Sequence, residues 1–212
     1  MSSEEKGQKD NKKFWDRYAK LYDFETNRFS KAAYKEMYRM MSAILNKKMK
    51  VLEIATGTGL IALNIARHVG SIEAIDFAPK MIEAAKKKKT PMNVNFSVAN
   101  AMDLPYEDGE FDAVIISNAL HIIPEPVVVL ENIKRVLKPE GILIAPSFSH
   151  SHIKEATWNL NAKVLKKIGL ETYSKWSPEE YVSFIGDNGF SVINMKVLRA
   201  AFPLIYLEAR KN

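Results

Sequence analysis

The chain contains no cysteine among its 212 residues. Disulfides, zinc–thiolate sites and a cysteine nucleophile are therefore excluded. The absence is compatible with a reducing cytoplasm, which is the compartment we expect. No apolar run reaches the roughly 18 residues that a membrane span needs. The polar start of the chain, MSSEEKGQKDNKK, has no apolar segment, so we expect no signal peptide.

The formal charge is +6, from 31 basic and 25 acidic residues. Lysines gather at 47–50, 86–89 and 163–167. They could serve an anionic partner such as nucleic acid or a lipid surface, or they could solvate the surface and the ends of helices. The lysine runs lack the interleaved arginines and aromatic residues of a base-stacking surface. We therefore favour the second interpretation and expect no specific nucleic-acid partner.

The length and the 47% hydrophobic content suit one domain with a sizeable core. Residues 1–10 are expected to form a disordered tail, and no linker divides the single domain 11–212. Within it we expect, in order, a helical lid (11–46), a core (47–148), a helical insertion that contributes to a ligand pocket (149–188) and an edge hairpin (189–212).

The lid should consist of two helices. Aromatic and apolar residues share one side of the first helix, from Asn11 to about Phe24: Phe14, Tyr18, Leu21 and Tyr22. Ser30 could cap the second helix, which reaches about Asn46. Its stripe contains Tyr34, Met37, Tyr38, Met41 and Leu45, for which we favour core packing. For Trp15, Tyr18 and Tyr22, core packing and a role as a lid over a ligand both stay open.

Strands and helices alternate through the core. The predicted strands are 51–54, 71–76, 94–100, 111–117 and 141–148, and the predicted helices are 58–68, 79–89 and 126–137. This order implies a parallel sheet covered on both faces.

Helices are expected next, and a hairpin last. Residues 153–168 read as helical, and Ser177-Pro178-Glu179-Glu180 is a good helix start because it combines an N-cap, a proline at the first position and a capping-box glutamate. The strands 191–198 and 202–210 lie too close in sequence for a parallel crossover. We therefore expect an antiparallel hairpin at the edge of the sheet.

The most informative stretch is VLEIATGTGLIA, residues 51–62, in which a strand runs through a glycine turn into a helix. Gly57 and Gly59 allow a tight turn that a ligand can approach closely. With Ala62 they match the dinucleotide pattern, and Asp76 ends the next strand, where a ribose-binding acid belongs. Two ligands fit this arrangement, a nicotinamide dinucleotide and S-adenosylmethionine.

Glu53 favours the second ligand. A carboxylate in the first strand, facing the turn, would repel a pyrophosphate. It could instead hold the ammonium group of a methionine tail.

These segments carry a family resemblance over about residues 14–148. VLEIATGTG resembles the first motif of class I S-adenosylmethionine-dependent methyltransferases, with Ala55 in place of the usual first glycine. IEAIDFAPKMIEAAKKK, VANAMDLPYEDGEFDAVIISNALHII and LKPEGILIAPSF resemble the following motifs, in order. WDRYAKLYD resembles the N-terminal element of the branch that methylates ubiquinone and menaquinone precursors and phospholipids.

The resemblance implies an α/β fold: a Rossmann-like, doubly wound, seven-stranded sheet, mostly parallel with an antiparallel last strand, and an N-terminal helical cap. It implies S-adenosylmethionine as cofactor and S-adenosylhomocysteine as product. The implied contacts to the methionine moiety and sugar are Glu53, Ala55, Gly57 and Gly59, with Asp76 on the ribose hydroxyls. The implied adenine contacts are Phe77, Met81, Asn100, Ala101 and Met102. Asn100 stands where the family usually has aspartate. Ser117 and Asn118 would line the methionine side.

The sulfonium is a good leaving group, so the protein needs mainly to align the acceptor and exclude water. His121 is the best candidate for a general base. It could instead be a packed or cap-forming histidine. Tyr18 and Tyr22 are the other candidate catalytic residues. His150 and His152 could face the acceptor, but no carboxylate spacing supports a metal site.

Our main hypothesis is methyl transfer from S-adenosylmethionine to a small or amphipathic molecule through an N, O, S or C nucleophile. An alternative is a phospholipid or quinone-precursor methyltransferase that acts at a membrane surface. The basic charge and the amphipathic N-terminal helices support this alternative. A third hypothesis is a non-catalytic S-adenosylmethionine-binding protein. The acceptor and the oligomeric state do not follow from the sequence.

Overall fold

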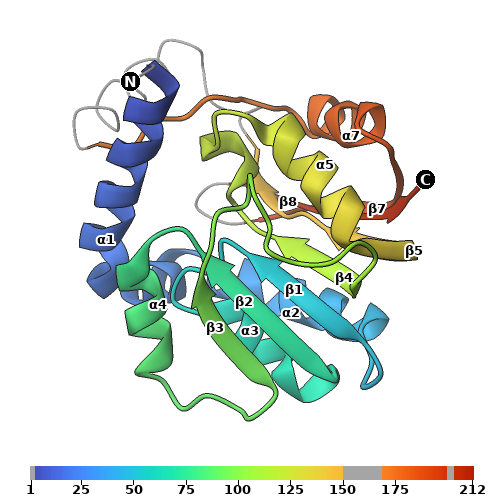
Figure 1. Cartoon of the computed structure of the whole chain (residues 1–212), viewed down its shortest axis with the longest axis horizontal. Coiled ribbons are helices and arrows are strands. Elements are labelled where there is room, and N and C mark those ends of the chain that lie inside the picture. The colour runs from blue at the N-terminus through green and yellow to red at the C-terminus, as the bar shows by residue number, and fades with distance from the viewer. Residues whose placement is uncertain (1–2, 150–168, 200–202) are drawn as a thin grey trace.

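A computed structural model describes residues 3–149, 169–199 and 203–212 (Figure 1). The helices longer than one turn are α1 (Ser3–Phe29), α2 (Lys31–Ile44), α3 (Leu60–Ile65), α4 (Pro79–Lys86), α5 (Pro126–Val136) and α7 (Pro178–Asp187). Two short 3-10 helices are η1 (Ala66–His68) and η2 (Leu120–Ile122). The strands are β1 (Lys50–Ile54), β2 (Ser71–Asp76), β3 (Val94–Val98), β4 (Phe111–Ile116), β5 (Leu137–Ile144), β6 (Ser147–Phe148), β7 (Phe190–Leu198) and β8 (Leu204–Lys211).

The described strands form one sheet in the order β3-β2-β1-β4-β5-β8-β6, with β7 paired to β8. The pairs from β3 to β5 are parallel, and β8 is antiparallel to both β5 and β7. The predicted doubly wound sheet with an antiparallel last strand is therefore confirmed, although the described sheet has eight strands instead of the predicted seven. The predicted hairpin is confirmed as well, but β8 lies between β5 and β7, so that only β7 forms the edge.

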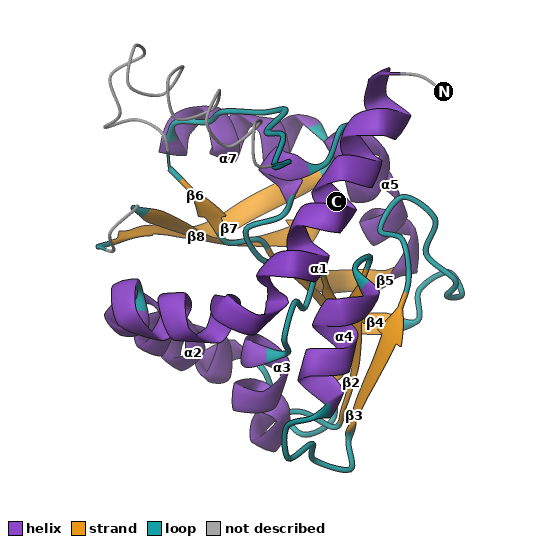
Figure 2. Cartoon of the chain, turned by 90° about the vertical axis from the view of Figure 1, so that its left-hand side faces the viewer, coloured by secondary structure: helices purple, strands orange, loops and turns teal. Residues whose placement is uncertain are grey.

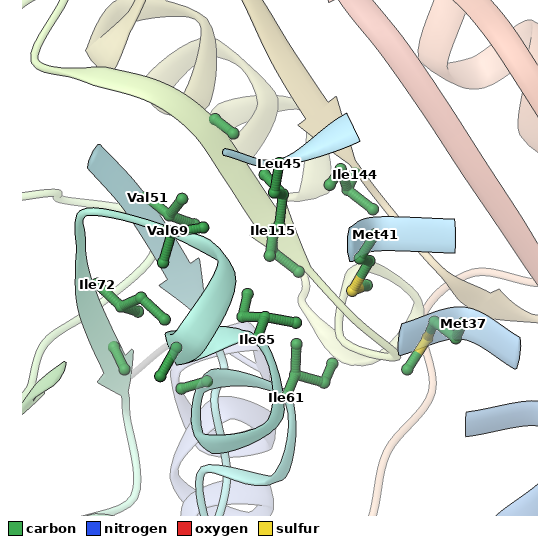
Figure 3. Close-up of a cluster of buried hydrophobic side chains, with 14 of the residues drawn as sticks. Met37, Met41, Leu45, Val51, Ile61, Ile65, Val69, Ile72, Ile115 and Ile144 are labelled. Carbon is green, nitrogen blue, oxygen red and sulfur yellow. The ribbon is translucent and has the colours of Figure 1, made fainter. Parts of the chain in front are cut away.

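Each face of the sheet carries its own layer of helices. α2, α3 and α4 supply buried side chains to one hydrophobic cluster, and α5 and α7 supply them to the other. Figure 3 shows the first cluster, in which Met37 and Met41 of α2 approach the isoleucines of α3 and the strands. Both methionines are fully buried, so the predicted packing role of the methionine stripe is confirmed.

The helix α1 runs past the layers instead of lying within one of them (Figure 2). It begins at Ser3, so the predicted disordered tail is wrong for residues 3–10. Glutamate, lysine and glutamine are good helix formers, and they extend the helix without an apolar stripe. Leu21 is also 55% exposed, so it does not belong to the buried side of this helix.

The predicted strand 141–148 is divided. β5 ends at Ile144 and β6 begins at Ser147, because Pro146 has no N–H to donate to a neighbouring strand. The Pro146 carbonyl instead accepts a hydrogen bond from the Asn118 N–H at 2.8 Å, which ties this break to the loop after β4.

The segment after β6 is described only in part. The predicted helix 153–168 lies outside the described residues, and residues 170–177 form no helix. The start of α7 is confirmed: Ser177 accepts a hydrogen bond from the Glu180 N–H, and the Glu180 carboxylate accepts one from the Ser177 N–H. Ser30 occupies the N-cap of α2 but makes no capping hydrogen bond with its side chain.

Candidate functional site

A cavity of about 720 Å³ lies at the carboxyl ends of the parallel strands, between the sheet and α1. This volume is within the range of small-molecule sites. The lining residues come from α1, α2, the loops after β1 to β4, β6 and the segment before α7. They are Asn11, Lys12, Phe14, Trp15, Tyr18, Tyr22, Thr26, Ser30, Tyr34, Ile54, Ala55, Gly57, Asp76, Phe77, Ala78, Met81, Ala99, Asn100, Ala101, Met102, Ser117, Asn118, Ala119, His121, Ile122, Ile123, Pro124, Phe148, Ser149, Leu170 and Thr172.

The structure brings together most residues that the sequence singled out for this site. Those that line the cavity are Tyr18, Tyr22, Ala55, Gly57, Asp76, Phe77, Met81, Asn100, Ala101, Met102, Ser117, Asn118 and His121. Glu53 and Gly59 lie outside this lining. His150 and His152 lie outside the described residues.

Asp76 is fixed to the glycine turn. Its carboxylate accepts hydrogen bonds from the Gly57 N–H at 2.7 Å and the Ala78 N–H at 2.8 Å. Burial raises the pKa of Asp76 to about 6, although these hydrogen bonds act in the opposite direction. Additional donors, such as ribose hydroxyls, would stabilise the ionised form.

Glu53 lies beneath the turn and is 1% exposed. Burial raises its pKa to about 8, against the opposing influence of the neighbouring Thr56 hydroxyl and Ala62 N–H. Its Oε2 atom has no hydrogen-bond partner among the described residues. A buried, unsatisfied carboxyl oxygen is costly, and a cationic group nearby would remove that cost. Because Glu53 does not line the cavity, its predicted role toward an ammonium group stays a prediction.

The conformation of the turn explains its sequence. Gly57 and Gly59 have φ angles of 57° and 79°, which residues with a side chain rarely adopt. A Cβ atom at Gly59 would lie 2.6 Å from the Phe96 ring. Gly59 therefore permits close packing of the turn on β3, and its role is to shape the site from outside the cavity. Ala55 adopts φ 55° despite its side chain.

The end of the cavity where the adenine base of the cofactor is expected, here called the base end, lies over β2 and β3. Phe77, Met81 and the segment Asn100–Met102 line it. The Asn100 Oδ1 atom accepts a hydrogen bond from the Met102 N–H at 3.1 Å. Asn100 thus shapes its own loop and contributes a polar edge to a largely apolar wall.

The opposite end of the cavity carries His121 and an aromatic lid. His121 is 7% exposed, and its ring lies 6.0 Å from the Phe148 ring, edge to face. Its carbonyl accepts a hydrogen bond from the Tyr173 N–H at 2.8 Å. Across the cavity, Tyr18 and Tyr22 belong to a run of mutually packed rings on α1. Burial and the neighbouring Tyr34, which shares a hydrogen bond with Tyr22, raise the pKa of Tyr22 well above its ordinary value. Tyr22 is thus a neutral phenol.

The N-terminal half of α1 is held over the end of the cavity that contains His121. Asn11 is 6% exposed and donates hydrogen bonds from Nδ2 to the carbonyls of Ile122 at 3.0 Å and Glu171 at 3.1 Å. Its Oδ1 atom accepts one from the Glu171 N–H at 2.6 Å. One asparagine therefore joins α1 to two loops that line the cavity.

Further along α1, two aspartates hold the helix against α4 and the glycine turn. Asp16 accepts a hydrogen bond from the Lys80 N–H at 2.9 Å, at the N-terminus of α4. Asp23 accepts a hydrogen bond from the Thr58 hydroxyl in the glycine turn and forms an ion pair with Lys88 at 2.6 Å. The lid interpretation of Trp15, Tyr18 and Tyr22 thus has a structural basis, because α1 is attached to both halves of the site.

Sequence reasoning missed several lining residues. It assigned Tyr34 to the core stripe of α2, yet Tyr34 lines the cavity as well as packing in the core. It also passed over Asn11, Phe148 and Ser149. Helical periodicity gave a signal for Tyr34, but it does not tell which turn of the helix projects beyond the sheet.

Comparisons with known proteins indicate the family of the chain. The family model described as a methyltransferase domain matches residues 52–145. The chain is 30% identical over 171 residues to the demethylmenaquinone methyltransferase of Staphylococcus carnosus, a match that covers 78% of this chain and 70% of that protein. It is 34% identical over 148 residues to the ubiquinone/menaquinone biosynthesis C-methyltransferase UbiE of Citrifermentans bemidjiense, covering 65% of this chain and 63% of that protein. A match to the Staphylococcus aureus demethylmenaquinone methyltransferase, at 35% identity, covers 62% of this chain and only 54% of the relative.

Solved structures share the fold. A putative methyltransferase, solved in complex with the Haloferax volcanii Trm112 methyltransferase activator, superposes with a TM-score of 0.81 at 18% identity, covering 95% of this chain and 97% of that one. A putative methyltransferase from Bacillus halodurans gives a TM-score of 0.71 at 19% identity, covering 84% and 99%. The sequence matches, the sheet order and the cavity beside the glycine turn together lead to one assignment: the chain belongs to the class I S-adenosylmethionine-dependent methyltransferases.

Proposed function

We propose that the protein transfers the methyl group of S-adenosylmethionine to a neutral, largely apolar small molecule, with a quinone precursor as the favoured class. One observation carries this proposal: the strand ends expected to hold the cofactor share a single cavity with an aromatic and aliphatic half suited to the acceptor. The names of the relatives in menaquinone and ubiquinone biosynthesis support the choice of a quinone precursor.

The charges around the cavity support a neutral acceptor. Among the described lining residues, the charged side chains are Lys12 and Asp76, and both lie at the base end. The acceptor half, around Phe14, Tyr18 and Phe148, offers rings and aliphatic side chains but no carboxylate that could pair with an amine headgroup. A flat aromatic acceptor would gain both burial and ring packing there. This disfavours the phospholipid alternative.

In this proposal, different residues would bind the cofactor, orient the acceptor and accept a proton. Glu53 and Asp76 would hold the cofactor, which supplies a methyl group on a good leaving group. The rings of α1 would orient the acceptor in line with that methyl group and exclude water. When a ring carbon or hydroxyl of the acceptor forms the new bond, it loses a proton, and we expect His121, which lines the cavity, to accept it.

A radiolabelled-methyl assay tests the proposal. The acceptors should include a short-chain demethylmenaquinone analogue in its reduced form, simple phenols, thiols, amines and phospholipid vesicles. We expect label in the reduced quinone. His121→Gln should lower kcat while the affinity for S-adenosylhomocysteine stays unchanged. Binding of S-adenosylhomocysteine without transfer to any acceptor would instead favour a non-catalytic binding protein.

The cellular compartment of the reaction is part of the same proposal. Among the described residues, none of the helices is both long and apolar enough to cross a membrane. A reducing cytoplasm remains the compartment that we expect, from the lack of cysteine. A membrane surface as the source of an amphipathic acceptor would appear in the assay as faster transfer to acceptor held in vesicles than in detergent.

A further inference from the structure

Asn11 is a buried polar residue of α1, and each of its bonds reaches the backbone of another segment. Its Nδ2 atom donates to the carbonyls of Ile122 at 3.0 Å and Glu171 at 3.1 Å, and its Oδ1 atom accepts from the Glu171 N–H at 2.6 Å. Both Nδ2 hydrogens and the carboxamide oxygen are therefore in use. Figure 1 shows the segment that contains Glu171 passing the N-terminal half of α1.

The partners of Asn11 are connected to His121 from two sides. Ile122 directly follows His121 in η2, so that one bond of Asn11 holds the next carbonyl of the chain. The His121 carbonyl itself accepts from the N–H groups of Tyr173 and Ser174, at 2.8 and 3.2 Å. These two residues belong to the segment before α7, which Asn11 also binds. Two successive carbonyls of η2 are thus held by α1 and by that segment, and Asn11 joins these two to each other.

This set of bonds lies in the wall of the cavity. Leu170 and Thr172, on either side of Glu171, both line it, and so do His121 and Ile122. A shift of α1 away from Glu171 would therefore change the shape of the wall as well as the cover above it.

The ring of His121 has little freedom while its backbone is held. It is 7% exposed and lies 6.0 Å from the Phe148 ring, edge to face. A held backbone and close packing leave a side chain few rotamers. A general base must lie within roughly 2.6–3.2 Å of the group that gives up the proton. Small displacements of η2 should therefore reduce proton transfer from an acceptor.

The bonds of Asn11 also make the position of η2 dependent on α1. Without this side chain, the carbonyls of Ile122 and Glu171 would each lose a donor, and the Glu171 N–H would lose its acceptor. Buried backbone groups without partners are costly, so the two loops would move toward water.

We propose that Asn11 is a positioning residue for methyl transfer, which sets the place of His121 through the backbone of η2. His121 is then in place only while α1 covers the cavity. This role rests on the proposed function, in which His121 accepts the proton that the acceptor loses. Closing the cavity and assembling its proton acceptor become one event.

Steady-state kinetics with a reduced short-chain demethylmenaquinone analogue tests this role. Asn11→Ala removes all three bonds, whereas Asn11→Asp keeps the size of the side chain and its acceptor but loses both donors. Each change should lower kcat roughly ten- to a hundredfold, within the usual contribution of a general base. The KM for S-adenosylmethionine should change less than about threefold, because Asp16 and Asp23 still hold α1 beside the proposed cofactor site.

A double variant shows whether Asn11 acts through His121. Asn11→Ala combined with His121→Gln should have the kcat of His121→Gln alone, within about twofold. Lys13→Ala, an exposed change on the same helix, is the control and should leave kcat and KM unchanged. Losses that multiply in the double variant, or an unchanged kcat in Asn11→Ala, would overturn the proposal.

A measurement without acceptor separates this proposal from the proposed function. In ¹⁵N spectra of the histidine rings with S-adenosylhomocysteine bound, the signal lost in His121→Gln identifies His121. Asn11→Ala should shift that signal, and Lys13→Ala should not. If the signal shifts but no acceptor is methylated, the proposed function fails and the link between Asn11 and His121 stands. An unshifted signal would overturn the link.

Calorimetry with S-adenosylhomocysteine shows whether each Asn11 variant is folded. If Asn11→Ala does not bind the ligand, Asn11→Asp takes its place in both comparisons. Loss of binding in both variants would also overturn the proposal, because Asn11 would then support the fold as a whole and not the position of His121.

Discussion

The Asp76 carboxylate and the Gly57 amide are joined across β2 and β1 by a hydrogen bond of 2.7 Å. A second bond, from the Ala78 N–H at 2.8 Å, holds the other carboxylate oxygen. The side chain is thus oriented by the backbone before any ligand binds. Such preorganisation lowers the cost of binding.

We expect Asp76→Ala to raise the dissociation constant of S-adenosylhomocysteine at least about tenfold, because charge-assisted hydrogen bonds contribute roughly 1.5–3 kcal/mol. Asp76→Asn should also weaken binding, since its amide N–H₂ must face one of two backbone N–H donors. Calorimetry measures both constants. An unchanged dissociation constant in both variants would remove Asp76 from the cofactor site.

Cofactor binding should strengthen as the pH rises from about 6 to about 9. The pKa of Asp76 is raised to about 6 and that of Glu53 to about 8, both chiefly by burial. The ionised forms are the ones that hold hydroxyls and an ammonium group, so binding should release protons. Calorimetry in two buffers of different ionisation enthalpy counts them. Glu53→Gln should abolish the release near pH 7–8, and proton-independent binding by the native protein would contradict the assignment of Glu53.

The unliganded protein should respond to pH in the opposite direction. Because the pKa of Glu53 is higher in the folded state than its usual 4.5, the folded chain holds more protons than the unfolded chain between pH 4.5 and about 8. The contribution of Glu53 is therefore fully present below pH 4.5 and is lost as the pH rises toward 8, at about 1.4 kcal/mol for each pH unit within that window. Urea unfolding of the native protein and Glu53→Gln at pH 5.5 and 8.5 measures this. The variant should lose less stability between the two pH values, and an equal loss would be the contrary result.

Asp23→Ala should loosen α1 over the cofactor. The change removes the hydrogen bond from the Thr58 hydroxyl and the ion pair with Lys88. We expect S-adenosylhomocysteine to dissociate roughly three- to tenfold faster in stopped-flow measurements, since one charged hydrogen bond is lost. Glu83→Ala, which removes an exposed ion pair with Lys80 on α4, is the matched control and should change little. Equal dissociation rates for all three proteins would show that Asp23 does not restrain the lid.

Gly59→Ala should destabilise the fold by roughly 1–3 kcal/mol, because it combines strain at φ 79° with a Cβ atom 2.6 Å from the Phe96 ring. Thermal unfolding measures the loss. Gly186→Ala, where a Cβ atom would meet nothing within 4 Å, is the control and should not destabilise. A Gly59 variant as stable as the control would show that the Phe96 ring can move aside.

The cofactor half of the site could be predicted well because its residues follow directly from strand ends. Ala55, Gly57 and Asp76 lie at or just after the ends of strands that alternation makes visible, and the carboxyl ends of parallel strands share one edge of a sheet. Local sequence therefore determines where these residues meet. Glu53 does not line the cavity, so its contact with the cofactor stays a prediction.

The acceptor half could be predicted only in part. Asn11, Ile122 and Glu171 come together through contacts between segments far apart in the sequence, which no local pattern encodes. The period of α2 placed Tyr34 and Met37 on one face but could not show that Tyr34 reaches past the edge of the sheet into the cavity. The predicted strand 141–148 ran through Pro146, and the break there, like the use of the Pro146 carbonyl by Asn118, depends on the loop after β4.

The attachment of α1 to both halves of the site has a consequence for the order of events during turnover. Asn11 holds the helix by hydrogen bonds beside the proposed acceptor pocket. Asp16 and Asp23 hold it by a hydrogen bond and an ion pair beside the proposed cofactor site. A cofactor that enters after the acceptor would have to displace a helix that the acceptor already packs against. Under the proposed function we therefore expect a compulsory order, in which the cofactor binds first and its product leaves last. A change of acceptor preference through residues of α1 would alter the residence time of the cofactor at the same time.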